Sequence, residues 1–469
     1  MRASAADRGS RRPIGVAIVG SGPAGFYAAE ALLAGGGDVR IDILDRLPTP
    51  FGLIRDGVAP DHQTTKKVAL KFERTALKPE VRFYGNVAVG RDVMLDDLRS
   101  MYDAVILAVG TPLDRPLGIP GEDKSGVYGS AAFVGWYNGH PDFRDLDPDL
   151  GTPAAAIVGN GNVALDVARV LAKTEVELAD SDLVDHAAQA IHAAPIADIH
   201  ILGRRGPAEA KFTNVELREM GQLRDCVPLA DPAQLGEAIG PMSDRDRRLR
   251  EKNLATLAGF ADLDAGTASK RAHFRFFAVP TEILGGDRVE GVRVARARLE
   301  DGRLVLTGET FEIPCGLVIS AIGYRSQPIT GAPFDADRGI VPNDDGRVAD
   351  GLYAVGWIKR GPTGVIASNR PDGVAVATSI RAAFDRGRKP GRQALDALLA
   401  RAGARPVGYA GWQRIDAAER ANATPPAPRR KFTRVAEMLA VLDAAPDRGD
   451  RQSAPRGAGE AARKQPAAT

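Results

Sequence analysis

The stretch IGVAIVGSGPAG, residues 14–25, decides the fold of this chain. Its first half is an apolar run that predicts a strand, and its second half is a glycine-rich turn that opens a helix over residues 23–33. Gly20 turns the chain tightly, Gly22 lets the backbone approach a pyrophosphate, and Gly25 lets the helix pack closely on the strand. The pyrophosphate would sit on the free amides at the start of that helix. The stretch therefore predicts a Rossmann-type dinucleotide site.

A second strand, Val39–Leu44, supports this interpretation because it ends in Asp45, twenty residues past Gly25. A carboxylate at this position accepts hydrogen bonds from the 2'-hydroxyl of an adenosine ribose and repels a 2'-phosphate. A glycine turn alone is a weak signal, and a turn that binds nothing is the alternative interpretation. Strand, helix and acid together favour the dinucleotide site.

The same pattern returns as AAAIVGNGNVA, residues 154–164, in which Ala164 takes the place of the third glycine. The next strand, at 199–202, ends in Gly203-Arg204-Arg205-Gly206 instead of an acid. Arginines there give charge-assisted hydrogen bonds to a 2'-phosphate, worth about 1.5 to 3 kcal/mol each. The first site is therefore predicted to hold FAD and the second NADP(H). An exposed arginine pair with no ligand is the alternative.

Composition narrows the class of protein. The 469 residues predict two to four domains, and 62 basic against 60 acidic residues give no overall attraction to nucleic acid. Cys226 and Cys315 are too few to hold an iron–sulfur cluster and too far apart for a redox pair, and we expect no metal centre. The low cysteine count favours a reducing compartment, the cytoplasm. With no run of eighteen apolar residues, we expect no membrane span.

Periodicity predicts further elements. Residues 48–62 are too rich in proline and glycine for a helix and too apolar for a solvated loop, so they predict a packed loop. A helix over 212–223 places Glu216 and Glu219 on one face. We also expect helices at about 63–77, 371–386 and 432–442, and antiparallel strands at 273–278, 288–297 and 304–313.

A basic run lies in the predicted helical region 231–260. Its members are Arg245, Arg247, Arg248, Arg250 and Lys252. The run has two interpretations, a solvated helix face and a docking patch for an acidic partner, and the sequence leaves both open.

Further motifs accompany the two glycine turns. They are PFGL (50–53), GVAPDH (57–62), WYN (136–138), GNGNVALD (159–166), GRRGP (203–207) and GWIKRGP (356–362). Together with GSGPAG (20–25), they resemble the adrenodoxin reductase type of ferredoxin–NADP+ reductase, especially its actinobacterial members. The resemblance extends over about residues 13–442.

This resemblance implies an α/β fold of two Rossmann-like dinucleotide-binding domains, with the NADP domain inserted in a discontinuous FAD domain. The expected boundaries are a flexible leader at 1–13, the FAD domain at 14–110 and 326–445, the NADP domain at 111–325, and a disordered tail at 446–469. The implied activity is hydride transfer from NADPH to FAD, and then transfer of single electrons to a small acidic ferredoxin. That iron–sulfur protein could serve a cytochrome P450 or another monooxygenase.

The resemblance also implies site residues by position. FAD contacts fall on Gly20, Gly22, Ala24, Gly25, Asp45, Leu53, Val87, Trp357, Gly364, Val365 and Ile366. NADP contacts fall on Arg115, Asn160, Gly161, Asn162, Val163, Arg204, Arg205, Glu216 and Gly364. His62 and Glu219 match the pair that the family holds near nicotinamide and flavin, where they would orient the nicotinamide and move protons. A loop histidine bonded only to backbone is the alternative for His62.

Two other functions are weighed against this one. An electron-transfer subunit resembling the glutamate synthase small subunit would usually carry cysteine-rich cluster motifs, and this sequence has two cysteines. A flavin-binding regulatory protein without turnover would fit the glycine turns equally well. Bleaching of bound flavin by NADPH separates that protein from an enzyme.

Overall fold

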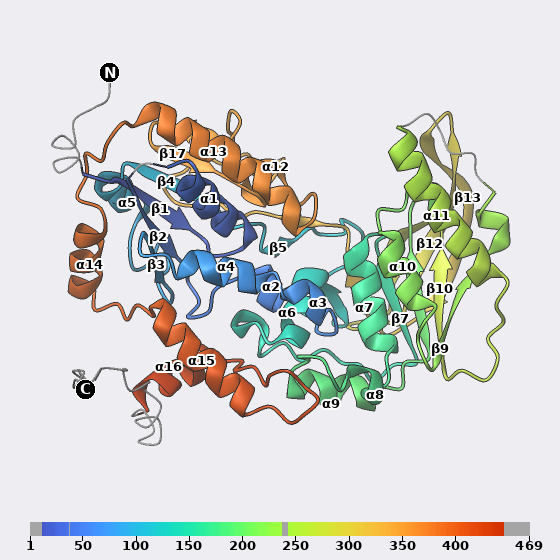
Figure 1. The fold of residues 1–469 in the computed structure, drawn as a ribbon. Coiled ribbons are helices and arrows are strands. Elements are labelled where there is room, and N and C mark those ends of the chain that lie inside the picture. The colour runs from blue at the N-terminus through green and yellow to red at the C-terminus, as the bar shows by residue number, and fades with distance from the viewer. Residues whose placement is uncertain (1–11, 37, 237–242, 445–469) are drawn as a thin grey trace, which may run out of the picture.

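The computed structural model describes residues 12–36, 38–236 and 243–444 (Figure 1). Two lobes are each built on a six-stranded sheet. The first sheet takes strands from both ends of the chain, and the middle of the chain forms the second lobe. The inserted arrangement expected from the resemblance is therefore present. Most of the predicted leader and the predicted tail, residues 1–11 and 446–469, lie outside the described residues.

The first sheet has the strand order β16-β17-β4-β1-β2-β3. All its strands are parallel except β16, which pairs with β17 in antiparallel fashion at the edge. The strands are β1 (Ile14–Val19), β2 (Val39–Leu44), β3 (Val81–Tyr84), β4 (Ala104–Leu107), β16 (Arg347–Ala349) and β17 (Leu352–Ala354). The order reverses between β1 and β4, and ligands of such sheets bind at the carboxyl ends of the strands beside this point.

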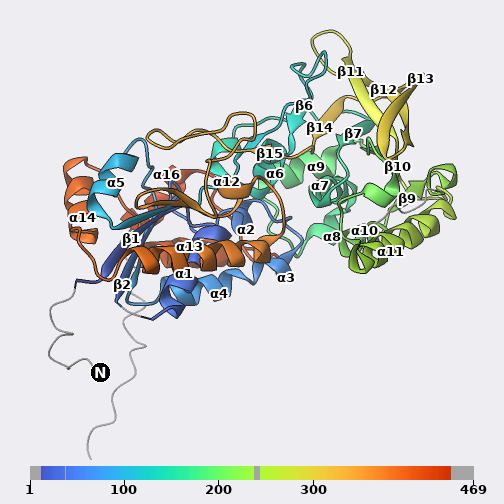
Figure 2. The same cartoon turned by 90° about the horizontal axis from the view of Figure 1, so that it is seen from above.

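Helices α1 (Pro23–Ala34), α4 (Ala69–Ala76) and α13 (Asn369–Ala383) cover one face of this sheet (Figure 2). The predicted helix over 63–77 is wrong as one piece. It is split into α3 (Gln63–Lys66) and α4, because short-range turns at Lys67 and Val68 interrupt it. The predicted loop over 48–62 contains the short helix α2 (Leu53–Asp56), which starts after Gly52 in a left-handed conformation with φ of 50°.

The second sheet has the order β6-β14-β7-β8-β10-β9, and every pairing in it is parallel. Its strands are β6 (Val127–Gly129), β7 (Ala154–Val158), β8 (Asp198–Leu202), β9 (Cys226–Ala230), β10 (Lys270–Arg275) and β14 (Leu317–Ser320). Its helices are α6 (Ser130–Asn138), α7 (Asn162–Ala172), α8 (Glu175–Leu178), α9 (Asp185–Ala193), α10 (Asn214–Met220) and α11 (Asp244–Ala261). The predicted repeat of strand, glycine turn and helix opens this lobe as well.

The predicted antiparallel strand over 273–278 is wrong. β10 ends at Arg275 and runs parallel between β8 and β9. The chain then bends at Phe277, whose φ is 52°, and Ala278 begins a separate antiparallel sheet. That sheet consists of β11 (Ala278–Leu284), β12 (Gly291–Glu300) and β13 (Arg303–Pro314). Alternating apolar residues predict a strand but do not reveal its partner.

Two connecting segments join the lobes and pair with each other as β5 (Leu113–Asp114) and β15 (Tyr324–Arg325). This ribbon supports the predicted domain boundaries near residues 110 and 325, which we keep as a proposal. The remaining helices are α5 (Leu95–Met101), α12 (Trp357–Arg360), α14 (Arg392–Arg401), α15 (Tyr409–Ala421) and α16 (Val435–Asp443). In the described part of the chain, no helix has the length and apolar character that crossing a bilayer requires.

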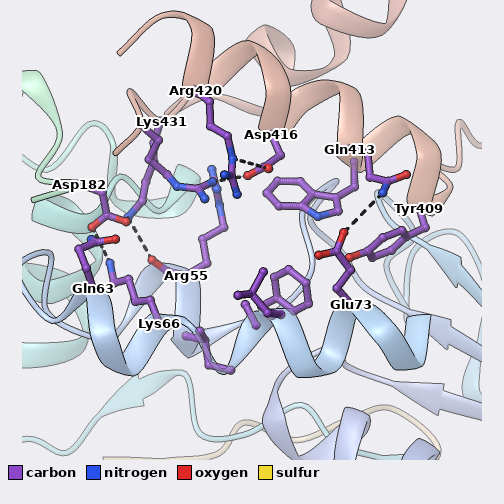
Figure 3. Close-up of a pocket in the computed structure, with 16 residues that line it drawn as sticks. Arg55, Gln63, Lys66, Glu73, Asp182, Tyr409, Gln413, Asp416, Arg420 and Lys431 are labelled. Atoms are coloured by element: carbon purple, nitrogen blue, oxygen red, sulfur yellow. Dashed lines mark hydrogen bonds and ion pairs between the residues drawn. The ribbon is translucent and has the colours of Figure 1, made fainter. Parts of the chain in front are cut away.

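The segment after α15 crosses from the first lobe to the second and is tied there by Lys431. The Lys431 Nζ donates to the backbone oxygens of Arg55 and Asn138, each at 3.0 Å, and lies 3.2 Å from Asp182 Oδ2. Lys66 Nζ contacts the other oxygen of Asp182 at 2.6 Å (Figure 3). Burial and the neighbouring Lys431 lower the pKa of Lys66 to about 7. One buried carboxylate thus holds two amines of the opposite lobe.

Candidate functional site

The glycine turn after β1 has the shape that a pyrophosphate requires. Gly20 has φ of 110°, and a Cβ there would lie 2.5 Å from the Ala108 backbone oxygen. A Cβ on Gly25 would lie 2.2 Å from the Gly20 oxygen, so this position packs helix on strand. A Cβ on Gly22 would meet nothing within 4 Å. The space above Gly22, at the first turn of α1, is where backbone amides can hold a phosphate.

Asp45 closes this turn and keeps part of its acceptor capacity. Its Oδ2 accepts from the Ser21 amide at 3.0 Å and the Ser21 hydroxyl at 2.5 Å, and its Oδ1 accepts from the Leu47 amide at 3.0 Å. A carboxylate offers about four lone-pair sites. About one site on Oδ1 is therefore left for a ribose hydroxyl.

The other residues predicted to contact FAD come from the same edge of the first sheet. Val87 follows β3 and is buried, while Trp357 follows β17 and donates from its indole to the Thr363 oxygen at 3.0 Å. Leu53 and Val365 expose 49% and 61% of their surface, which is unusual for large apolar side chains. Ala24 is buried in α1, and Gly364 and Ile366 flank Val365 before α13. Exposed apolar side chains at this edge fit an apolar ring that would cover them.

The second glycine turn repeats the geometry of the first. Gly159 has φ of 151°, and a Cβ there would lie 2.3 Å from the Ala321 oxygen, whereas Gly161 faces open space. Ala164 is fully buried at the third position. Asn162 Oδ1 accepts from the Thr213 amide at 2.8 Å, which fixes the loop above the turn. The two glycine turns therefore have the same backbone geometry.

Arg204 and Arg205 follow β8 and are both exposed beside this second turn. Arg205 contacts Glu209 at 3.3 Å, and Arg204 makes no ion pair among the described residues. Asn160 and Val163 lie in the turn itself and at the start of α7. Arg115 lies apart from this group, exposed at the end of β5 in the ribbon between the lobes.

The two lobes bring His62 and Glu219 together, although 157 residues separate them in sequence. His62 Nε2 lies 2.8 Å from Glu219 Oε2 and 3.5 Å from Glu216 Oε2, and its Nδ1 lies 3.9 Å from Asp166 Oδ1. All four side chains are partly buried. The interpretation of His62 as a loop histidine bonded only to backbone is therefore wrong, because its ring faces three carboxylates of the other lobe.

A buried arginine at the centre of this group explains how the loop of His62 is held. Arg169 is fully buried on α7, and its Nε and Nη2 donate to the Asp61 carboxylate at 2.8 and 3.2 Å. Lys173 Nζ adds a contact to Asp61 at 2.8 Å. The Asp182 amide donates to the Pro60 oxygen at 3.1 Å. The residues just before His62 are thus attached to the second lobe from two sides.

Crowded charges shift the protonation of this group. Burial lowers the pKa of His62, but the hydrogen bond with Glu219 and the nearby aspartates outweigh it, and the net pKa is raised. Burial and the adjacent Asp166 raise the pKa of Glu216 to about 7. Burial also acts on Glu219, yet its bond to His62 and the nearby Arg169 lower its pKa. Near neutral pH the group can therefore give or take one proton with little change in free energy.

Sequence reasoning missed Asp61, Asp166, Arg169 and Lys173. Asp166 and Arg169 are one turn apart on α7, a spacing that is visible in the sequence. Nothing in the sequence alone connects them to Asp61, which lies in the other lobe. The GVAPDH motif did include Asp61, but only His62 was singled out.

A separate pocket of about 100 Å³ lies between α4 and α15 (Figure 3). Phe51, Trp412 and Tyr409 form part of its apolar lining, and Arg55 and Lys66 lie at its charged end. None of the residues predicted to contact FAD or NADP lines it. This pocket is therefore distinct from both glycine turns.

Comparisons with known proteins agree with this geometry. The family model described as pyridine nucleotide-disulphide oxidoreductase matches residues 14–200. The chain is 43% identical over 453 residues to the mitochondrial NADPH:adrenodoxin oxidoreductase of Salvelinus fontinalis, covering 92% of this chain and 91% of that protein. It is 42% identical to the NADPH-ferredoxin reductase FprA of Mycobacterium tuberculosis, covering 92% and 99%. The solved structure of that FprA in complex with NADPH superposes with a TM-score of 0.87 at 41% identity, covering 92% and 100%.

The raised pKa of Glu216 predicts a pH-dependent effect on stability. Ionised Glu216 costs free energy in the folded protein, so its stabilising contribution is complete below its usual carboxyl pKa and is lost as pH rises through about 7. We expect Glu216→Gln to raise the free energy of unfolding at pH 8 by about 1 kcal/mol or more, and by little at pH 4.5. Melting temperatures measured across this range test it.

Glu219→Gln is the matched control, one helical turn away. Because folding lowers the pKa of Glu219, its contribution is present above its usual pKa and is lost as pH falls. The Glu219→Gln protein should therefore be less stable than the parent at pH 8. If both variants change stability with the same sign, the charge balance described for this group is incorrect.

Proposed function

Because the chain belongs to the family of NADPH-ferredoxin reductases and NADPH:adrenodoxin oxidoreductases, we propose that it passes electrons from NADPH through FAD to a ferredoxin-type iron–sulfur protein. It is a flavin-dependent oxidoreductase. One observation carries the proposal beyond family membership. The two glycine turns share their geometry but differ in the residues after the next strand, Asp45 in one lobe and Arg204 with Arg205 in the other.

We assign FAD to the first lobe. The open space above Gly22 accommodates the pyrophosphate, and the free acceptor of Asp45 accommodates a ribose hydroxyl. The exposed side chains of Leu53 and Val365 would cover the flavin ring. Bound FAD supplies the conversion between a two-electron donor and a one-electron acceptor.

We assign NADPH to the second lobe. The turn at Gly161 takes the pyrophosphate, and the guanidinium groups of Arg204 and Arg205 take the 2'-phosphate. Two of the predicted NADP contacts, Glu216 and Gly364, come from opposite lobes. The nicotinamide end of NADPH would then lie between the lobes, close to His62.

His62 and Glu219 act as positioning residues in this proposal. Hydride transfer between nicotinamide and flavin needs no proton donor or acceptor from the protein. The paired ring and carboxylate would orient the carboxamide of the nicotinamide. They would also take or return the proton that accompanies the electrons, together with the adjacent Glu216, whose pKa burial and Asp166 raise to about 7.

We propose α11 as the docking surface for the iron–sulfur partner. Arg248 and Lys252 are exposed, Arg247 and Arg250 are partly exposed, and none of these four makes an ion pair within the described residues. Unpaired cations on one helix attract an acidic protein. That partner would in turn serve a cytochrome P450 or another monooxygenase.

We also propose that the protein works in a reducing compartment such as the cytoplasm. Cys226 and Cys315 are buried and free. Burial raises the pKa of each thiol to about 12, so both stay protonated and unreactive.

Anaerobic reduction of the bound flavin tests the cofactor assignment. NADPH should bleach the flavin band much faster than NADH at the same concentration. The double variant Arg204→Ala with Arg205→Ala should lose roughly two to four decades of this preference, because two charge-assisted hydrogen bonds to the 2'-phosphate disappear. Arg303→Ala, an exposed arginine on β13, is the control and should keep the preference.

Equal bleaching by both nucleotides in the parent would contradict the assignment of the two arginines. A protein that takes up no FAD would contradict the assignment of the first turn. A yellow protein that neither nucleotide reduces would be a binding protein instead of an enzyme.

Charge reversal tests the docking surface. Arg248→Glu with Arg250→Glu should raise the apparent KM for an acidic ferredoxin several-fold, and more at low ionic strength, while reduction of a small artificial acceptor is unchanged. Lys78→Glu with Arg303→Glu makes the same charge change at exposed positions elsewhere and should leave both reactions unaltered. Equal losses with both acceptors would show that the basic residues of α11 are structural.

A further inference from the structure

The side chains of His62, Glu216 and Glu219 lie together between the lobes, with their possible metal-ligand atoms close to one another. The Nε2 of His62 and one carboxylate oxygen each of Glu216 and Glu219 lie within 4.8 Å of one another. The two distances from the ring nitrogen are 2.8 and 3.5 Å. Tetrahedral Zn²⁺ with bonds of about 2.0 to 2.2 Å separates its ligands by about 3.3 to 3.6 Å. Among the residues that the structure describes, no other set of three His, Cys, Asp or Glu side chains brings its possible ligand atoms this close together.

The side chains around these atoms carry more negative than positive charge, which favours binding of a divalent cation. Four carboxylates meet here, those of Asp61, Asp166, Glu216 and Glu219, and they face the cations Arg169 and Lys173. When His62 is neutral and all four carboxylates are ionised, which is the state that a metal would bind, the group carries two negative charges in excess of its positive ones. One divalent ion would balance them.

The donor set selects the kind of ion. An imidazole nitrogen with two carboxylate oxygens suits Zn²⁺, whereas Mg²⁺ prefers six oxygens and keeps several waters. The two glutamates lie one turn apart on α10, and His62 starts α3 in a loop held by Asp61. The three donors therefore come from anchored backbone.

Arg169 is the competing cation. Its Nη1 lies 3.3 Å from the Glu216 oxygen and 3.1 Å from the Glu219 oxygen that would bind the metal. Arg169 keeps its contacts to Asp61 and Asp166 if it releases these two, and each glutamate has a second oxygen to offer it. Metal binding would thus rearrange two ion pairs without leaving the guanidinium unpaired.

We propose that His62, Glu216 and Glu219 bind one Zn²⁺ ion reversibly and that the bound ion inhibits reduction of the enzyme by NADPH. The ion would occupy the ring nitrogen and the carboxylate oxygens that position the nicotinamide. The proposal that zinc binds is argued from geometry and charge alone. The proposal that zinc inhibits reduction by NADPH rests on the proposed function. In this proposal zinc is a reversible inhibitor and not a resident cofactor. It is therefore compatible with the expectation from the sequence that the protein has no resident metal centre.

Calorimetric titration of the FAD-loaded protein with zinc chloride tests the binding. We expect one saturable site per chain, and magnesium chloride at the same concentrations should give none. Glu216→Gln should weaken zinc binding at least about tenfold, because an amide is a poor zinc ligand. His273→Gln is the control, since His273 bonds to the Asp198 carboxylate at 2.7 Å and stacks on His200, so its loss should leave zinc affinity unchanged. The visible spectrum of each variant shows whether it still folds around flavin.

The same titration points, followed by the rate of flavin bleaching with NADPH, test the inhibition. The rate should fall in parallel with zinc occupancy and recover when a chelator is added. Absence of saturable binding, or full zinc affinity in both Glu216→Gln and Glu219→Gln, would overturn the proposal. Zinc binding in a protein that NADPH never reduces would leave the metal site standing and remove the proposed function instead.

Discussion

The buried pair of Arg169 and Asp61 is the interaction that holds the rest of the site in place. A guanidinium without water is very unfavourable unless carboxylates surround it, and Arg169 has no exposed surface. Its main partner, Asp61, lies in the other lobe and directly precedes His62. Satisfying the arginine therefore fixes both the approach of the lobes and the position of the histidine. The hydrogen bond between His62 and Glu219 is a consequence of that constraint.

The same glycine-turn geometry occurs in both lobes of this molecule. The turns at Gly20 and Gly159 have the same left-handed glycine and the same close approach to a neighbouring backbone oxygen. The charge after the next strand distinguishes them. In the proposed assignment, the carboxylate of Asp45 favours a free ribose hydroxyl, whereas the cations Arg204 and Arg205 favour a phosphate, and this difference would direct each nucleotide to its own lobe.

Local sequence patterns predict the central strands and the glycine turns well. They do not predict which strands or side chains pair when these are far apart in the sequence. β1 and β2 have the bounds that the sequence predicts, because an apolar run ends at glycine in β1 and an alternation of apolar and polar residues ends at an acid in β2. The prediction for 273–278 is wrong because alternation does not reveal which strand is the neighbour. Helices α14 and α15 were not predicted. The pairing of His62 with Glu219 came from the resemblance, whereas Arg169 and Asp61 share no pattern that a single sequence displays.

A crystal structure of the protein with FAD and NADP+ bound would show whether the lobes hold the two nucleotides as proposed. We predict the 2'-phosphate of NADP+ against Arg204 and Arg205, and its nicotinamide beside the flavin within contact of His62 and Glu219. We also predict that Arg169 still joins Asp61 across the lobes. A nicotinamide bound away from the His62 pair, or a loaded enzyme in which the Arg169 contact is broken, would contradict this arrangement.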